Sequence, residues 1–103
     1  MSNRVGAPKG GRVHWLLWHL PSAFKGSYVL QYNYAEHNYV FERRQGKQLF
    51  DVFVVKQTSA HYWKVSYCCP SLGVFEFFGY KNTRIIAERM VEIWRETSDG
   101  VEV

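Results

Sequence analysis

The sequence predicts an α+β fold in which a five- to six-stranded antiparallel meander sheet is packed by one C-terminal α-helix. Two observations support this fold class. Between residues 27 and 80, aromatic or aliphatic side chains alternate with polar ones in five bursts that are separated by turn residues. From Thr83 onward the apolar period changes from two residues to the period of a helix. Because the connections between bursts are short, we expect consecutive strands to pair antiparallel in chain order.

The chain length and composition predict one globular domain. The protein has 103 residues, of which 47% are hydrophobic and 21% are charged. This is enough for a single core but not for two. We divide the chain into a flexible basic arm (1–11), a single α+β domain (12–97) and a short acidic tail (98–103).

The segment 12–20 contains a short apolar run that fits either a buried strand or a helix. We predict a strand, because Pro21 ends the run and no N-cap residue or acidic first turn opens it. A loop over 21–26 follows.

Five further strands are expected over 27–35, 39–43, 49–56, 61–68 and 72–80. Alternation in the first of these places Tyr28, Leu30, Tyr32 and Tyr34 on one face. In the turn that follows Arg44, Gly46 supplies the positive φ that a tight hairpin needs.

The C-terminal helix is predicted to start after Asn82, which is a good N-cap residue, and to end near Thr97. Its apolar stripe contains Ile86, Met90 and Trp94, which should be buried against the sheet. One helix can cover one sheet face but not both. The many aromatic residues therefore predict additional cover from the N-terminal segment with its tryptophans, an exposed apolar patch, or a homodimer.

Charge is distributed unevenly along the chain. Residues 1–50 carry seven Lys and Arg against two acidic residues, which is +5, and residues 51–103 carry six against seven, which is −1. Basic residues beside an aromatic sheet, where Tyr28, Trp63 and Tyr67 could stack with bases, are typical of nucleic-acid binding. The residues predicted to contact the partner are Arg43, Arg44, Lys47, Lys64, Tyr39, Arg12 and Lys9. The first hypothesis is therefore a small non-enzymatic nucleic-acid-binding module that uses the basic arm and the basic hairpin.

Two other functions remain as alternatives. Tyr, Trp and Arg are also the residues that dominate protein interfaces, which favours a small protein-binding inhibitor or adaptor of the phage type acting on a host protein. A small metal-free ribonuclease is the third hypothesis, because Glu36, His37, Tyr39, Arg43 and Arg44 cluster around one predicted hairpin.

No cofactor or metal is expected. The four His lack zinc spacing, and the two cysteines, Cys68 and Cys69, are adjacent and would point to opposite faces of a strand. The N-terminus lacks the apolar core of a signal peptide, and no apolar run is long enough for a membrane span. We therefore expect a cytoplasmic protein with reduced cysteines and no membrane partner.

Overall fold

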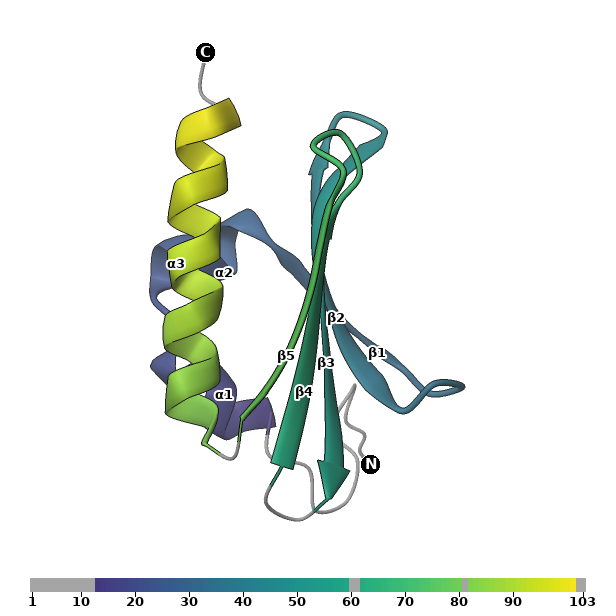
Figure 1. Ribbon diagram of the computed structural model, residues 1–103, viewed down its shortest axis with the longest axis vertical. Coiled ribbons are helices and arrows are strands. Elements are labelled where there is room, and N and C mark those ends of the chain that lie inside the picture. Colours follow the sequence, from purple (N-terminus) through teal and green to yellow (C-terminus); the bar gives the residue numbers. More distant parts are fainter. Residues whose placement is uncertain (1–12, 60–61, 81, 102–103) are drawn as a thin grey trace.

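Five strands and three helices make up the described part of the chain, and the helices lie on one side of the sheet (Figure 1). The computed structural model describes residues 13–59, 62–80 and 82–101. The helices are α1 (Val13–His19), α2 (Ser22–Ser27) and α3 (Thr83–Val101). The strands are β1 (Val29–Asn33), β2 (Asn38–Gln45), β3 (Gln48–Ser59), β4 (Tyr62–Cys69) and β5 (Val74–Tyr80). The fold is therefore a two-layer α+β arrangement, as the sequence predicts.

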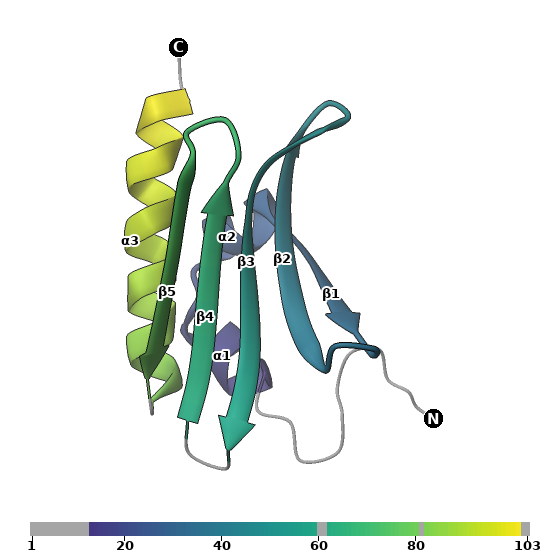
Figure 2. The ribbon, with the colours of Figure 1, turned by 45° about the vertical axis from the view of Figure 1, so that its right-hand side comes forward.

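The sheet is a meander in which each strand pairs antiparallel with the next, in the order β1-β2-β3-β4-β5 (Figure 2). This confirms the predicted antiparallel meander. The sheet has five strands, where five or six were predicted. The β2–β3 hairpin turns at Gly46, where φ is 65°, and the β4–β5 connection contains Gly73, where φ is 71°. A residue without a Cβ adopts this left-handed backbone without strain, so the predicted role of Gly46 is confirmed.

The core lies between the helices and the inner face of the sheet, and it is largely aromatic. The strand register sets Phe41 opposite Phe53 and Phe53 opposite Tyr67, so a row of rings crosses the three central strands. Phe24 of α2 packs on this row, with its ring centroid 6.1 Å from that of Phe41 and 5.8 Å from that of Phe53. None of these four side chains is more than 2% exposed. Large rings bury much apolar area per residue, which suits a domain of this size.

The predicted strand over 12–20 is wrong. This segment forms α1, and the predicted loop after it is mostly α2. Leu16, Leu20 and Phe24 are spaced four residues apart and are 0%, 3% and 0% exposed. All three belong to the buried core cluster, so the two short helices and the link between them supply the additional cover that the sheet required.

The C-terminal helix begins where the sequence predicts. The backbone N–H of Arg84 donates to the Asn82 side-chain oxygen at 2.7 Å, which confirms Asn82 as the N-cap. Ile86 and Met90 are fully buried, whereas Trp94 is partly buried against the core. The helix continues to Val101, beyond the predicted end, so most of the predicted tail is helical. α3 lies alongside β5 and β4 and runs along the strands (Figure 2), and α1 packs beside it.

The opposite face of the sheet carries no described element (Figure 1). Val40, Val52 and Val54 are partly exposed there, and Lys56 and Lys64 are exposed. The tyrosine-bearing face is therefore the inner face. Within the described residues, no helix combines the length and the apolar character needed to cross a membrane.

Candidate interaction surface

Arg43 lies on β2, but its side chain is not exposed on the basic hairpin, as the predicted partner contact requires. Its side chain is 14% exposed and forms an ion pair with Asp51 of β3, which is fully buried. Nε of Arg43 donates to Oδ1 of Asp51 at 3.0 Å, and Nη2 donates to Oδ2 at 2.5 Å. In this bidentate contact, two parallel N–H···O bonds join the guanidinium to the carboxylate, which is the strongest geometry for such a pair. Arg43 therefore stabilises the fold and is not free to contact a partner.

The carboxylate of Asp51 accepts two more hydrogen bonds, from the Tyr28 hydroxyl at 3.0 Å and from the Tyr67 hydroxyl at 2.9 Å. The arginine in turn donates to Thr97 Oγ1 at 2.9 Å and to Ser98 Oγ at 2.8 Å. A buried charge is tolerated when it is paired and its hydrogen-bonding capacity is satisfied. The cluster meets both conditions and connects the end of α2 and three strands to the C-terminal part of α3.

Burial raises the pKa of both phenols well above the ordinary 10.0, and the negative charge of Asp51 raises it further. For Arg43, burial alone would lower the pKa, but the hydrogen bond to Asp51 and the charges around the guanidinium reverse the direction. At neutral pH the guanidinium of Arg43 is therefore charged, and the two phenols are neutral hydroxyl donors.

We expect the protein to lose stability above about pH 10. Below that pH Tyr28 and Tyr67 are protonated in both the folded and the unfolded state and contribute no pH dependence. Above it the unfolded state releases protons that the folded state retains, so each tyrosine lowers the free energy of unfolding by about 1.4 kcal/mol per pH unit. Urea unfolding across this range measures the slope. Tyr67→Phe should reduce this slope by the contribution of one tyrosine. If the slope does not change, the raised pKa of Tyr67 is contradicted. Tyr34→Phe is the control, because Tyr34 is exposed.

The other two cations of the predicted hairpin are at the surface. Arg44 is 49% exposed, pairs with Glu42 at 3.3 Å, and donates to the backbone oxygen of Lys47 at 3.1 Å. Lys47 is exposed. Without Arg43, the exposed basic hairpin consists of one lysine and one arginine already paired with a carboxylate.

Of the remaining predicted basic residues, only Lys64 is in the described part of the chain. Lys64 lies on the uncovered face of the sheet, directly opposite Lys56. Lys9 and Arg12 lie outside the described residues. Among the predicted basic residues that the structure describes, Arg43, Arg44, Lys47 and Lys64 therefore do not form one patch.

The predicted stacking surface is part of the core. Tyr39 is 4% exposed, and burial, followed by the neighbouring Tyr32 and Tyr34, raises its pKa to about 12. Trp63 and Tyr67 are 3% and 1% exposed. These rings face the helices and cannot stack with a base.

The residues of the ribonuclease hypothesis are divided between two ends of one strand. Glu36 and His37 lie in the turn before β2, whereas Arg43 and Arg44 lie near its far end. Among the described residues, no three His, Cys, Asp or Glu side chains gather in a way that could hold a metal ion. Both cysteines are free thiols.

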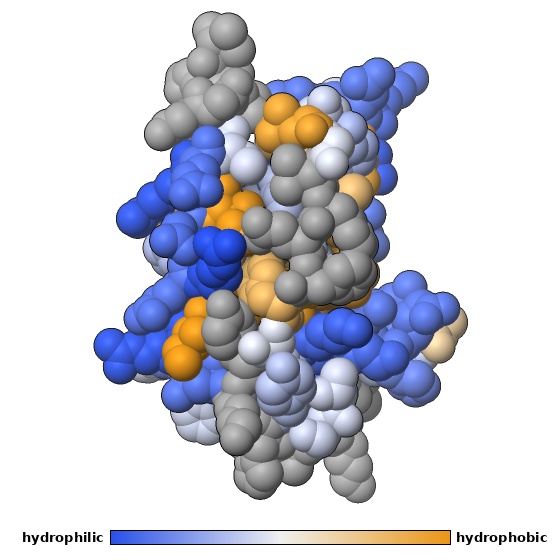
Figure 3. Space-filling view, in the orientation of Figure 1, coloured by the Kyte–Doolittle hydropathy of each residue, from blue (hydrophilic) through white to orange (hydrophobic). Residues whose placement is uncertain are grey.

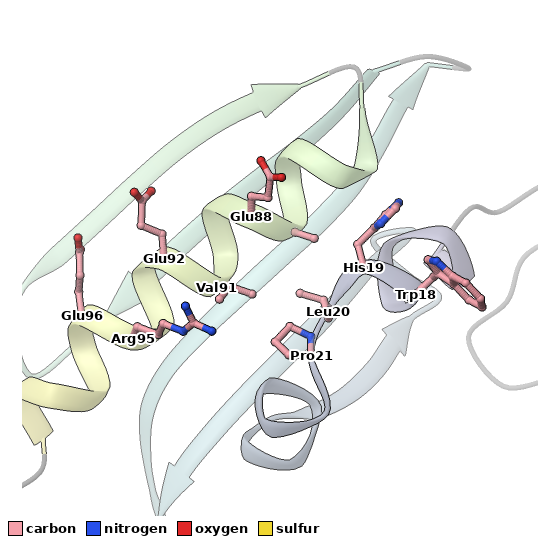
Figure 4. Close-up of a pocket in the computed structure, with 10 residues that line it drawn as sticks. Trp18, His19, Leu20, Pro21, Glu88, Val91, Glu92, Arg95 and Glu96 are labelled. Atoms are coloured by element: carbon pink, nitrogen blue, oxygen red, sulfur yellow. The ribbon is translucent and has the colours of Figure 1, made fainter.

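A groove of about 700 Å³, which we call the α1–α3 groove, lies between the end of α1 and one side of α3 (Figure 4). Leu20 and Pro21, which join α1 to α2, form one wall, and Ala87 and Val91 of α3 form the other. Trp18 stands at its end and is 80% exposed. An indole this exposed beside an apolar groove is unusual, because isolated proteins bury most of the surface of their tryptophans.

Charged side chains of α3 surround this apolar floor. Arg95 extends toward Pro21, whereas Glu88, Glu92 and Glu96 project from α3 away from Pro21 and form an acidic rim along the outer edge of the groove (Figure 4). The exposed Arg84 pairs with Glu88 at 3.4 Å, and the partly exposed Arg89 pairs with Glu92 at 2.7 Å. Ion pairs at the protein surface contribute little free energy. The glutamates of the rim can therefore exchange their arginine partners for cations of another protein. Apolar areas interrupt the hydrophilic surface on the side where α3 lies (Figure 3).

The sequence pattern did not predict this groove, because Trp18 was expected to help cover the core. The four-residue spacing of Leu16 and Leu20 was the available signal. When these residues face inward on a helix, Trp18 is rotated by about 200° from Leu16 and must face outward.

Comparisons with protein-family models, with curated proteins and with solved structures gave no match.

Proposed function

We propose that this protein is a small non-enzymatic protein-binding module, of the inhibitor or adaptor kind, whose α1–α3 groove receives an amphipathic helical segment of another protein. The observation that carries the proposal is the 80% exposure of Trp18 beside an apolar groove. Tryptophan is the residue most enriched among those that dominate binding energy at protein interfaces.

The shape of the groove favours a helix as its occupant. The α3 residues that line it run from Ala87 to Glu96, which corresponds to about 14 Å along the helix axis. A partner helix of two to three turns would place an apolar stripe of comparable length between Leu20 and Val91, in the helix-in-groove mode of recognition.

The charge of the rim favours a basic segment. Three glutamates and one arginine line the groove, so lysine or arginine beside the apolar stripe of the partner would face Glu88, Glu92 or Glu96. An acidic residue at the centre of the partner segment would face Arg95. Complementary charge of this kind fixes partner choice and orientation more than raw affinity.

Two labelled helical peptides test the proposal. Both carry leucines at helical spacing, and they differ only in flanking lysines or flanking glutamates. By fluorescence anisotropy the lysine peptide should bind about tenfold more tightly than the glutamate peptide. Trp18→Ala should weaken its binding by about tenfold to thirtyfold.

Trp15→Ala is the matched control, because Trp15 is also on α1 and 51% exposed but does not line the groove. Equal losses from the two tryptophan variants, or no binding of either peptide, would contradict the proposal. The nucleic-acid hypothesis would replace it if a single-stranded oligonucleotide bound with a steep salt dependence and Lys64→Ala weakened that binding.

A further inference from the structure

Within the described residues, the edge strand β1 lacks the usual protection against pairing. In the described part of the chain β1 pairs only with β2, whereas the other edge of the sheet, β5, has α3 packed beside it (Figure 2). Natural edge strands are usually blocked by lysine, proline, a bulge or a covering element. The sequence of β1, Val-Leu-Gln-Tyr-Asn, contains no charge, proline or glycine, and its register with β2 runs without a shift.

Apolar side chains are exposed along this edge. Val29 is 63% exposed and Leu30 is 37% exposed, and Tyr34, directly after the strand, is 64% exposed. In an antiparallel ladder alternate residues direct their N–H and C=O groups away from the neighbouring strand. The edge therefore combines unused backbone hydrogen-bonding groups with exposed apolar surface.

We infer that β1 pairs with β1 of a second copy of this chain, antiparallel about a two-fold axis at Gln31, to form a continuous ten-stranded sheet. Centring the axis on Gln31 uses all five residues of the strand. It also keeps the two sheet faces aligned, because residues directly opposite each other in a ladder share a face.

The side chains that this register brings together are compatible. Leu30 of one copy meets Tyr32 of the other on the inner face, which is an aliphatic–aromatic pair of the kind that stabilises sheets. Val29 meets Asn33 on the outer face. The pairing brings no like charges together, since the strand is uncharged. A five-residue ladder buries less surface than a permanent dimer needs, so the association should be reversible and concentration-dependent.

A charge pair at the two-fold axis tests this inference. Sedimentation of the parent protein over a concentration series should show conversion from one copy to two. Gln31→Lys and Gln31→Glu each place two like charges side by side on the axis, so each variant alone should self-associate about fivefold to tenfold more weakly. An equimolar mixture of the two variants should restore the dimer, because opposite charges then meet.

Gln48→Lys is the matched control, since Gln48 is exposed but lies on an interior strand. It should leave self-association unchanged. A parent protein that stays monomeric, or equal effects of Gln31→Lys and Gln48→Lys, would overturn the inference. So would a mixture that fails to restore the dimer, because the charges would then not meet on a two-fold axis. Restoration by mixing also excludes misfolding of the single variants. The result does not depend on the peptide binding of the α1–α3 groove.

Discussion

Arg43→Met should lower the free energy of unfolding by about 3–5 kcal/mol, as the loss of one member of a buried ion pair does. Methionine keeps most of the length of the side chain but removes four donated hydrogen bonds, two of them to Asp51. Among the described residues, only the hydroxyls of Tyr28 and Tyr67 would then hold the fully buried carboxylate of Asp51. Urea unfolding followed by tryptophan fluorescence measures the loss.

Arg44→Met is the matched control for this prediction. Arg44 is the next residue along the strand and is 49% exposed, so its loss should change stability by no more than about 0.5 kcal/mol. A double variant with Arg43→Met and Asp51→Asn should be less destabilised than the sum of the two single changes, since the second removes the charge that the first leaves unpaired. Equal and small effects of Arg43→Met and Arg44→Met would show that the ion pair does not hold the fold.

Phe24→Ala should cost about 3–5 kcal/mol, as the removal of a fully buried ring usually does. Phe24 is 0% exposed. Its ring centroid lies 4.5 Å from that of Tyr28 and 5.6 Å from that of Trp94, in addition to its contacts with the row of rings on the sheet. α2 has only six residues, and helices this short depend on packing for their stability. The substitution should therefore also detach α1 and α2, which would appear as faster amide exchange in both helices.

Trp18→Ala is the control that removes a larger ring from the same layer. Because Trp18 is 80% exposed, its loss should cost less than about 1 kcal/mol. If Phe24→Ala is at least as stable as Trp18→Ala, the packing of α2 does not stabilise the core. The same Trp18→Ala protein serves the peptide-binding test, where its expected stability separates a loss of contact from a loss of fold.

The strands and α3 could be predicted from the sequence because their signals are local. Alternation at Tyr28, Leu30 and Tyr32 marks a strand whatever surrounds it, and Gly46 marks the turn that follows β2. Asn82 and the stripe through Ile86 and Met90 mark the start and the buried face of α3. In each case the residues that carry the signal are close in sequence, so backbone geometry alone relates them.

The segment before β1 was predicted incorrectly because two signals competed within it. Leu16 and Leu20 have the spacing of a helix, but Trp15, Leu17 and Trp18 are also apolar and obscure that spacing. Periodicity cannot distinguish a buried strand from a short helix in such a run. The helical conformation is favoured by tertiary packing, because it buries Phe24 and the two leucines in the core against the sheet.

By itself, the sequence determined the order of the strands, the turns and the C-terminal helix, because these depend on the alternation and period of neighbouring residues. Only the tertiary structure decided the roles of the charged residues. Arg43 and Arg44 are neighbours of the same type, yet one holds a buried carboxylate and the other faces solvent. The difference arises because Asp51, Thr97 and Ser98 reach Arg43 from β3 and α3, and contacts between residues so far apart in sequence exist only once the chain has folded.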